Sequence, residues 1–460
     1  MQPRRYLVLA ICCMSLLIIS LDVTIVNVAL PAISEDLDAP VSGLQWIIDA
    51  YTLVLASLLV LAGSTGDRIG RRRVFQAGLA LFTIGSLLCS VAPSLEMLIL
   101  FRMVQAVGGS MLNPVAMSII TNTFTEPRER ARAIGVWGAV TGFSMALGPL
   151  AGGVLVHTLG WRSIFWINVP VGIAAFLLAW RFVPESRAEH PRRLDPVGQL
   201  LVLTLLAALT FGIIEGPAAG WSSPLIIGCF ALAAAALAGL LRWEPRRDEP
   251  LIELRFFRSA PFSGATLIAV CAFASLGGFL FLNTLYLQEV RGLSALQAGL
   301  YTLPMAAMTI VASPLSGRLV GSRGTRLPLH IAGTAMALGM LPLTWAGSDT
   351  PAWQLFAGYL LFGFGFGMVN TPITNTAVSG MPRARAGVAA AIASTSRQVG
   401  SALGVAVIGA VVASGTGPDS AAGWWIMFAL GLAVLLVGHL STGRWAQATA
   451  ARTTPDAVPA

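Results

Sequence analysis

The sequence predicts an all-α polytopic membrane protein of about fourteen transmembrane helices, built as two six-helix bundles with two helices inserted between them. Composition, the spacing of apolar stretches and an internal repeat all lead to this fold class. Of the 460 residues, 56% are apolar and 11% are charged, and the mean hydropathy is +0.77. Soluble domains contain roughly 25% charged residues. The chain therefore needs the bilayer as its solvent.

Apolar stretches recur along the chain at lengths near the roughly 20 residues that cross a hydrocarbon core of about 30 Å. The first follows Arg4 and Arg5 as a signal peptide would, but it runs from Tyr6 to Leu30, which is too long for an h-region. We therefore expect it to be a helix. The predicted spans are 6–30, 44–65, 74–92, 95–120, 132–156 and 162–181, then 197–214 and 223–242, then 262–287, 297–320, 328–346, 352–376, 386–413 and 421–440.

The loops between these spans predict four segments and an orientation. All 29 basic residues are Arg, and with both termini in the cytoplasm the Arg-rich loops are cytoplasmic, as the positive-inside rule requires. Only Arg162 and Arg291 then lie outside, while Arg102 and Arg397 lie within spans. The net charge of +8 thus reflects topology in a cell (inner) membrane rather than nucleic-acid binding. The segments are a first bundle (1–185), a two-helix insert with cytoplasmic linkers (186–258), a second bundle (259–442) and a cytoplasmic tail (443–460).

An internal repeat supports this division. The segment 121-TNTFTEPRERARAIGV-136 resembles 374-TNTAVSGMPRARAGV-388. Three pairs of glycines are separated by the same offset of 252 residues. A second group of three positions recurs at an offset of 254 residues, and there the aspartate of the first half is replaced by glycine in the second. These offsets span eight helices rather than six, so two helices are inserted. The pairs are Gly135, Gly148 and Gly152 with Gly387, Gly400 and Gly404, and Gly63, Asp67 and Gly70 with Gly317, Gly321 and Gly324.

Two related bundles predict a transporter, in which the halves rock around a site at their interface. A channel is disfavoured for the same reason. An ATP-driven pump is excluded because the chain contains no Lys and therefore no phosphate-binding loop of the Walker type. An enzyme is disfavoured because the four His lie near span ends or in loops without an HExxH motif.

Four motifs resemble those of the major facilitator superfamily, and more narrowly its fourteen-helix branch of drug:proton antiporters. They are 21-LDVTIVNVALP-31, 63-GSTGDRIGRRR-73, 142-GFSMALGPLAGG-153 and 161-WRSIFWINVPVG-172. The resemblance implies a proton-coupled exporter of small amphipathic or cationic drugs and antibiotics. We expect no cofactor beyond the proton gradient, no metal, because the five Cys lie within apolar spans, and function as a monomer in the lipid bilayer. A dedicated exporter of one antibiotic or metabolite is the alternative.

Three charges inside predicted spans are candidates for proton coupling. Asp22 is the leading one, because an acid in a span costs roughly 2.5–3.5 kcal/mol and usually marks function. At about 1.5 Å rise per residue, Asp49 and Arg102 fall at a similar depth on spans two and four. We expect Arg102 to neutralise one acid while the other exchanges a proton. The structural alternatives are a packing role for Asp22, hydration of Asp49 and carbonyl binding by Arg102.

The connection between predicted spans two and three is a candidate gate. Its glycines permit a tight turn, and its acid can accept from Arg or cap a neighbouring helix, giving a latch between rocking halves. Simple membrane anchoring is the alternative for its arginines. The gating-loop residues are Gly63, Asp67, Arg68, Gly70, Arg71 and Arg72.

The glycine-proline pair of the third motif lies in the middle of a span. Pro149 removes a backbone hydrogen bond and kinks the helix, while the glycines let it approach a neighbour. The resemblance identifies Gly148, Pro149, Gly152 and Gly153 as the antiporter motif, although Ser144 replaces one expected Gly. A plain kink is the alternative. Likewise 102-RMVQAVGGS-110 resembles a fourth-helix motif associated with proton transfer, with Ala106 in place of Gly.

Aromatic and amide side chains on spans nine and twelve are candidates for the substrate-binding wall, since such linings suit bulky amphipathic ligands. Arg397 is a further candidate near the middle of span thirteen, where the repeat places Met145 in the first half. A cation there hinders cationic cargo unless it is neutralised, and it favours anionic or zwitterionic cargo. Similar sequences carry Arg in 396-SRQVGSALG-404, so we expect a structural role. The wall candidates are Phe279, Asn283, Tyr286, Phe362, Phe366 and Asn370.

Overall fold

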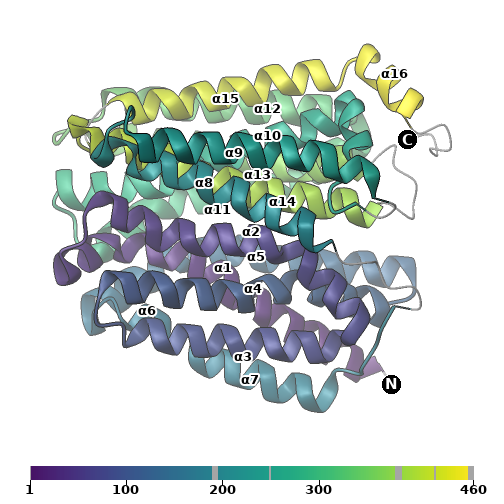
Figure 1. Ribbon diagram of the computed structural model, residues 1–460. Helices are drawn as coiled ribbons and strands as arrows, with labels where there is room; N and C mark the ends of the chain where they lie inside the picture. Colours follow the sequence, from purple (N-terminus) through teal and green to yellow (C-terminus); the bar gives the residue numbers. More distant parts are fainter. Residues whose placement is uncertain (1, 189–194, 248–249, 379–385, 419–420, 454–460) are drawn as a thin grey trace. The chain divides into compact units, whose positions relative to one another are not determined.

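The computed structural model describes residues 2–188, 195–247, 250–378, 386–418 and 421–453. Fourteen of the described helices are long and apolar enough to cross a membrane, so the predicted number is confirmed. They group into two compact units (Figure 1). Unit 1 is Met1–Gln199 with Leu293–Leu300, and unit 2 is Leu200–Gly292 with Tyr301–Ala460.

Unit 1 contains six spans, and the sixth is divided at Ile167 into a short and a long helix. Within it α3 and α2 pack along α4, and α1 packs along α5. Its core is apolar and includes Leu79, Phe82 and Ile119. The helices are α1 (Gln2–Leu37), α2 (Val41–Ile69), α3 (Arg71–Ser90), α4 (Leu95–Thr123), α5 (Pro127–Leu159), α6 (Ser163–Trp166) and α7 (Asn168–Phe182).

Unit 2 contains the remaining spans, with α10 packed along α14 and α12 packed along α13 and α15. The first residues of α8 (up to Gln199) and of α11 (up to Leu300) belong to unit 1. The α-helices are α8 (Pro196–Ala219), α9 (Pro224–Trp243), α10 (Ala260–Leu285), α11 (Ala295–Arg323), α12 (Arg326–Met340), α13 (Ala352–Val378), α14 (Ala386–Val411), α15 (Ala421–Ser441) and α16 (Arg444–Thr453). Shorter 3₁₀ and π turns are η1 (Glu244–Arg246), η2 (Leu254–Arg258), η3 (Tyr286–Val290), η4 (Leu341–Trp345) and η6 (Val412–Thr416).

Local sequence explains where several helices begin. The Glu126 side chain accepts from the Glu129 amide at 2.7 Å just before Pro127, so α5 starts with a cap and a proline. Ser94 caps α4 in the same way. Between α2 and α3 the chain turns at Gly70, whose φ of +130° suits a residue without a Cβ.

Two of the predicted glycine pairs pack in the same way in each unit, whereas Gly135 has nothing within 4 Å. Gly148 and Gly152 pack α5 on α1, and Gly400 and Gly404 pack α14 on α10. A Cβ at Gly404 would lie 2.1 Å from the Ala274 carbonyl oxygen, so the two backbones touch. The part of the repeat at 379–385 lies outside the described residues. The repeat is therefore a property of the fold and not only of the sequence.

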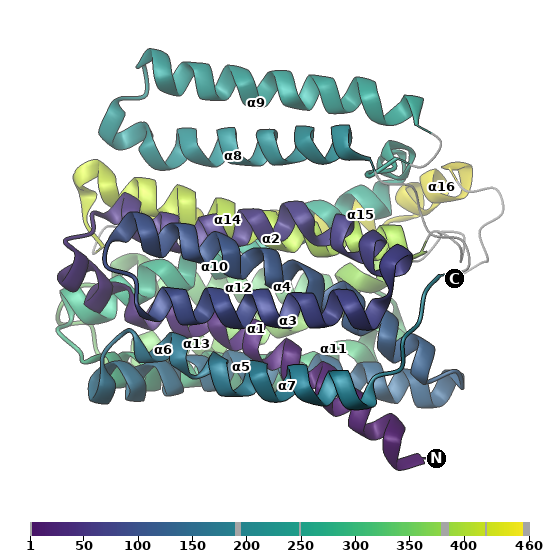
Figure 2. The same cartoon turned by 60° about the horizontal axis from the view of Figure 1, so that its bottom comes forward.

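The inserted pair, α8 and α9, run alongside each other (Figure 2). Gly212 on α8 faces the Phe230 ring on α9, which a Cβ would approach to 3.0 Å. The first turn of α8 is fastened to α2 because Gln199 Nε2 donates to the Ser57 carbonyl. The linker residues 189–194 lie outside the described part.

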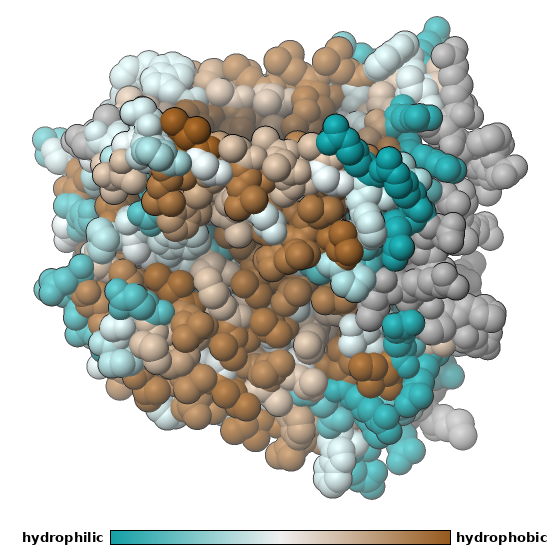
Figure 3. Space-filling view, in the orientation of Figure 1, coloured by the Kyte–Doolittle hydropathy of each residue, from teal (hydrophilic) through white to brown (hydrophobic). Residues whose placement is uncertain are grey.

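Two features of the surface follow from the membrane setting. Large apolar side chains such as Leu225, Leu232 and Leu436 are more than half exposed, which fits lipid contact. Figure 3 shows hydrophobic residues over the middle of one face and hydrophilic residues gathered towards its ends.

The predicted tail contains a helix that was not expected from the sequence, α16. Its Thr449 Oγ1 accepts from the Ala260 amide at 2.9 Å.

Candidate functional site

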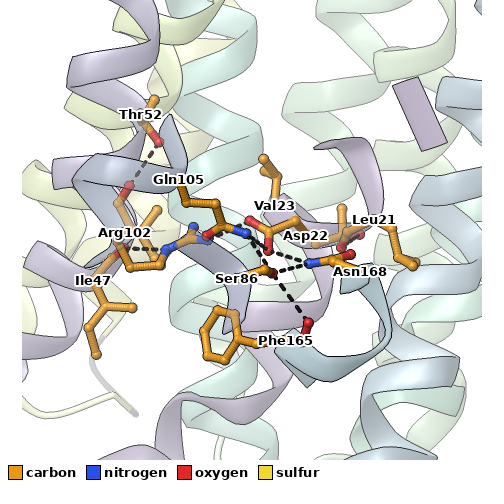
Figure 4. Close-up of polar contacts among 12 residues, drawn as sticks. Leu21, Asp22, Val23, Ile47, Thr52, Ser86, Arg102, Gln105, Phe165 and Asn168 are labelled. Atoms are coloured by element: carbon orange, nitrogen blue, oxygen red, sulfur yellow. Dashed lines mark hydrogen bonds and ion pairs between the residues drawn. The ribbon is translucent and has the colours of Figure 1, made fainter. Parts of the chain in front are cut away.

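Asp22, on α1, lies at the centre of a buried polar network in unit 1 (Figure 4). Its Oδ2 accepts from Arg102 Nη1 at 2.5 Å. Its Oδ1 accepts from Gln105 Nε2 at 2.8 Å and from Asn168 Nδ2 at 3.0 Å. Three donors therefore compensate one carboxylate, as buried charge requires.

Arg102, on α4, is also fully buried. Besides Asp22, it donates through Nη1 to Gln105 Oε1 at 2.6 Å and through Nε to the Ile47 carbonyl at 3.2 Å. Its guanidinium carbon lies 4.1 Å from the centroid of the Tyr51 ring, a cation–π contact. The structure thus brings Asp22 and Arg102 together, as the depth argument predicted.

Asp49 is buried as completely as Asp22 but lies apart from this network. Neither of its carboxyl oxygens has a hydrogen-bond partner among the described residues. Tyr51 faces Arg102, and a residue two positions earlier lies about 200° around the helix, so Asp49 points away from that guanidinium. Arg102 therefore neutralises one acid, Asp22, and leaves the other without a cation.

Three network residues were not predicted: Gln105, Asn168 and Ser86. Ser86 Oγ accepts from Gln105 and Asn168 at 3.1 and 3.0 Å and donates to the Phe165 carbonyl at 3.2 Å. Gln105 carried a signal, because it lies three residues after Arg102 and so on the same helix face. Asn168 lies within 161-WRSIFWINVPVG-172, but that motif does not indicate which residue of it contacts Asp22. Ser86 carried no signal, since an isolated hydroxyl in a span is ordinary packing.

The helices that carry this network are held backbone to backbone. A Cβ at Gly108 on α4 would lie 2.3 Å from the Phe82 amide nitrogen on α3. A Cβ at Gly85 on α3 would lie 2.7 Å from the Gln105 backbone nitrogen. Ala106, where the fourth-helix motif departs from its usual Gly, is simply buried. Close packing therefore falls to neighbouring glycines and fixes Gln105 beside Asp22.

The candidate gating loop is tied down within unit 1. Asp67 accepts from Arg71 Nε at 3.0 Å, and its carbonyl accepts from the Ala188 amide at 3.1 Å. Gly63 lies in ordinary contact with Pro114. Arg68 is exposed. The acid of the loop therefore binds Arg of its own motif, one of the two roles that the sequence suggested.

The second suggested role, capping a neighbouring helix, is taken by Glu185, which the sequence analysis did not select. Glu185 Oε1 accepts from the Arg72 amide at 3.0 Å, at the start of α3. Its other oxygen lies 3.9 Å from Arg72 Nε and 3.7 Å from Arg73 Nε. A Cβ at Gly70 would lie 2.7 Å from Oε1, so this glycine makes room for the carboxylate.

The antiporter-motif glycines bring α5 against its neighbours. A Cβ at Gly148 would lie 1.9 Å from Thr24 Oγ1, two residues from Asp22. Gly152 packs on α1 in the same way, and Gly153 packs on residues 295–296, which belong to unit 1. Ser144 is tolerated in place of Gly because its hydroxyl donates to the Val140 carbonyl of its own helix at 2.8 Å.

Most of the predicted wall residues form one buried aromatic cluster in unit 2. Phe279 stacks on Phe362 at 4.9 Å between centroids, and Phe362 stacks on Phe366 at 6.4 Å. Tyr359 Oη donates to Asn283 Oδ1 at 2.5 Å. The cluster also contains Tyr286 and Trp424, whose rings lie 6.1 Å apart. Tyr359 and Trp424 were not predicted; as single aromatic residues they carry no distinguishing signal.

Asn370 and Arg397 are not part of this cluster. Both are partly exposed. Arg397 Nη1 lies 3.4 Å from Thr374 Oγ1, and Thr374 donates to the Asn370 carbonyl at 3.1 Å. The structure therefore separates an aromatic part of the candidate wall from a polar part.

Comparison with known proteins finds relatives that span most of the chain. The chain is 38% identical to the multidrug resistance protein Stp of Mycobacterium tuberculosis, over 90% of this chain and 77% of that protein. It is 36% identical to the tetracenomycin C resistance and export protein of Streptomyces glaucescens, over 91% and 78%. It is 33% identical to the multidrug efflux pump LfrA of Mycolicibacterium smegmatis, over 89% and 81%.

A solved structure shares the fold. The partially occluded inward-open conformation of the xylose transporter XylE from E. coli matches with a TM-score of 0.66, covering 94% of this chain and 97% of that one at 16% identity. The family model described as Major Facilitator Superfamily matches residues 12–405. With that model and these relatives spanning most of its length, the chain belongs to the Major Facilitator Superfamily as a multi-pass membrane transporter.

Proposed function

We propose that this transporter exports amphipathic drugs or antibiotics in exchange for protons, by alternating access, with both termini in the cytoplasm. The observation that supports it most is that two buried acids differ in their hydrogen-bond partners. Asp22 has a cation and two amide donors, whereas Asp49 has no partner among the described residues. The relatives that are named as drug or antibiotic exporters support the cargo class.

In this proposal Asp49 carries the proton. A buried carboxylate without donors is costly, whereas the neutral acid is not, so a proton occupies Asp49 while it is enclosed. Contact with water or with cationic cargo lets the ionised form replace the neutral one. Binding of a proton and binding of cargo then exclude each other, which is what antiport requires.

Asp22 has a different role in this proposal, although its position in a span made it the leading candidate for proton exchange. Its carboxylate holds Arg102, and together they join α1 to α4. Neutralising Asp22 would leave a buried guanidinium unpaired, which is strongly unfavourable. Asp22 therefore acts on coupling by positioning Arg102 and the network around it.

Transport of ethidium into inverted membrane vesicles tests the proposal. Wild type should accumulate the dye when a proton gradient is imposed and stop when the gradient is collapsed. Asp49→Asn mimics the protonated acid, so it should exchange dye down a concentration gradient but not respond to protons. Asp22→Asn should lose both activities, because Arg102 loses its partner.

Glu96→Gln is the matched control, since Glu96 is an exposed acid in the first turn of α4. It should transport as wild type does. Wild-type transport that ignores the gradient, or an Asp49→Asn protein that remains proton-driven, would contradict the mechanism. Accumulation of one compound only, among several dyes and antibiotics, would favour the dedicated exporter.

A further inference from the structure

Two arginines lie inside predicted spans, and their surroundings differ. Arg102 has a carboxylate at 2.5 Å, an amide oxygen and an aromatic ring. Arg397, on α14 of unit 2, belongs to none of the ion pairs among the described residues. Within the described part of the chain, its side chain has a polar contact with Thr374, whose Oγ1 lies 3.4 Å from Nη1. A charge within a span is normally paired, whereas Arg397 has no counter-charge among the residues that the structure describes.

Thr374 does not supply that charge. Its hydroxyl proton is used in a bond to the Asn370 carbonyl at 3.1 Å, so only an oxygen lone pair faces the guanidinium. Arg has five N–H donors and stays protonated at any physiological pH. Arg397 is partly exposed, and the contact of Nη1 with Thr374 accounts for one of these donors.

The bundle architecture does not require a cation at this position. The repeat places Met145 at the equivalent point of α5, and α5 still packs on α1 through Gly148 and Gly152. In unit 2, α14 packs on α10 through Gly400, three residues beyond Arg397. The packing is therefore complete in both units with an apolar residue in one and a cation in the other.

We propose that Arg397, beside Asn370 and Thr374, binds an anionic oxygen of the exported compound: a carboxylate, phenolate or enolate. A guanidinium fits such a group with paired hydrogen bonds. The inference rests on the proposed export function and deepens it, because it assigns anionic or zwitterionic amphiphiles to the cargo in addition to cations.

The headgroup of an anionic membrane lipid offers the same chemistry. Thr374 lies four residues before the last residue of α13, roughly 6 Å along the helix, so a headgroup is a competing source of the anion. We assign the site to the exported compound, and the experiment separates the two sources.

Binding and transport of two dyes of opposite charge test this. Fluorescein is the anionic probe and ethidium the cationic one. Binding to the purified protein is followed by fluorescence anisotropy, in nanodiscs of neutral phosphatidylcholine and of phosphatidylglycerol. Arg397→Gln should raise the Kd and KM for fluorescein about tenfold and leave those for ethidium within about twofold. Arg397→Lys should restore part of the fluorescein affinity.

Arg258→Gln is the control, because Arg258 is an exposed arginine of η2 in the same unit. It should change neither dye. Equal losses for both dyes in Arg397→Gln would show a structural role and overturn the inference. Unchanged fluorescein binding in Arg397→Gln would also overturn it. A loss of fluorescein binding that appears only in phosphatidylglycerol nanodiscs would assign the anion at Arg397 to lipid and overturn it as well.

Binding also separates this inference from the proposed function. Fluorescein bound through Arg397 without proton-driven uptake of either dye would support the anion site and contradict antiport. Proton-driven ethidium uptake with no fluorescein binding by wild type would support antiport and contradict the anion site.

Discussion

Arg102 Nη1 lies 2.5 Å from Asp22 Oδ2, and both side chains are fully buried, so each charge depends on the other. Removing one partner of a buried pair costs about 3–5 kcal/mol, because the remaining charge is uncompensated. Arg102→Gln and Asp22→Asn should each lower the stability by about that amount. The double variant should be less destabilised than the sum, since neither charge remains.

Unfolding of the detergent-purified variants, followed by intrinsic fluorescence, measures this coupling. Because two units are present, the comparison uses the transition that shifts in the single variants. Additive losses in the double variant would mean that the contact between Arg102 and Asp22 carries no energetic coupling.

The fold was accessible from the sequence because its signals are long and redundant. The number of spans follows from apolar lengths, and the Gly148 to Gly400 correspondence predicted packing that the structure confirms. The division of the sixth span at Ile167 and the helix α16 were not predicted, since neither changes the apolar pattern.

The candidate site was accessible only in part. A charge in a span is visible in sequence, so Asp22, Asp49 and Arg102 could be selected, but helical depth does not say which acid the arginine reaches. That depends on rotation of α2, which turns Tyr51 towards Arg102 and Asp49 away from it. Partners without charge, such as Asn168, need the tertiary structure.

Replacing Gly148 by a larger residue should create a steric clash between α5 and α1. A Cβ there would lie 1.9 Å from Thr24 Oγ1, and filling a tight contact typically costs 1–3 kcal/mol. Gly148→Ala should therefore abolish proton-driven dye transport and lower the unfolding midpoint. Gly135→Ala, on the same helix with nothing within 4 Å, should be neutral or slightly stabilising. Equal behaviour of the two variants in vesicle transport and thermal unfolding would contradict this packing.

Removing the Glu185 carboxylate should loosen the start of α3 next to the gating loop. Its carboxylate accepts from the Arg72 amide at 3.0 Å and so caps α3 from a distant part of the chain. Loss of a helix cap costs about 1 kcal/mol, equivalent to a roughly fivefold increase in local opening. Glu185→Ala should therefore speed amide hydrogen exchange in a peptide covering 70–75 by about that factor, with little change in the rest of unit 1.

The control for this cap is Glu129→Ala. Glu129 lies 3.6 Å from Arg5 in a pair that is about half exposed, and such surface pairs contribute less than about 1 kcal/mol. Exchange over 70–75 should not respond to it. If Glu185→Ala also leaves that exchange unchanged, the loop is held by the Asp67 and Arg71 contacts without help from Glu185.

The hydrogen bond between Tyr359 and Asn283 allows a test of whether the aromatic cluster of unit 2 depends on it. Tyr359 Oη donates to Asn283 Oδ1 at 2.5 Å, and Asn283 Nδ2 has no partner among the described residues. Tyr359→Phe leaves a buried amide unpaired and should cost about 1–3 kcal/mol, whereas Tyr359→Phe with Asn283→Leu removes both polar groups and should recover most of it. Tyr301→Phe, whose ring lies against Phe356, is the control and should be neutral in the same unfolding measurement. A double variant less stable than Tyr359→Phe would show that Asn283 is held by something other than Tyr359, which would separate this amide from the cluster.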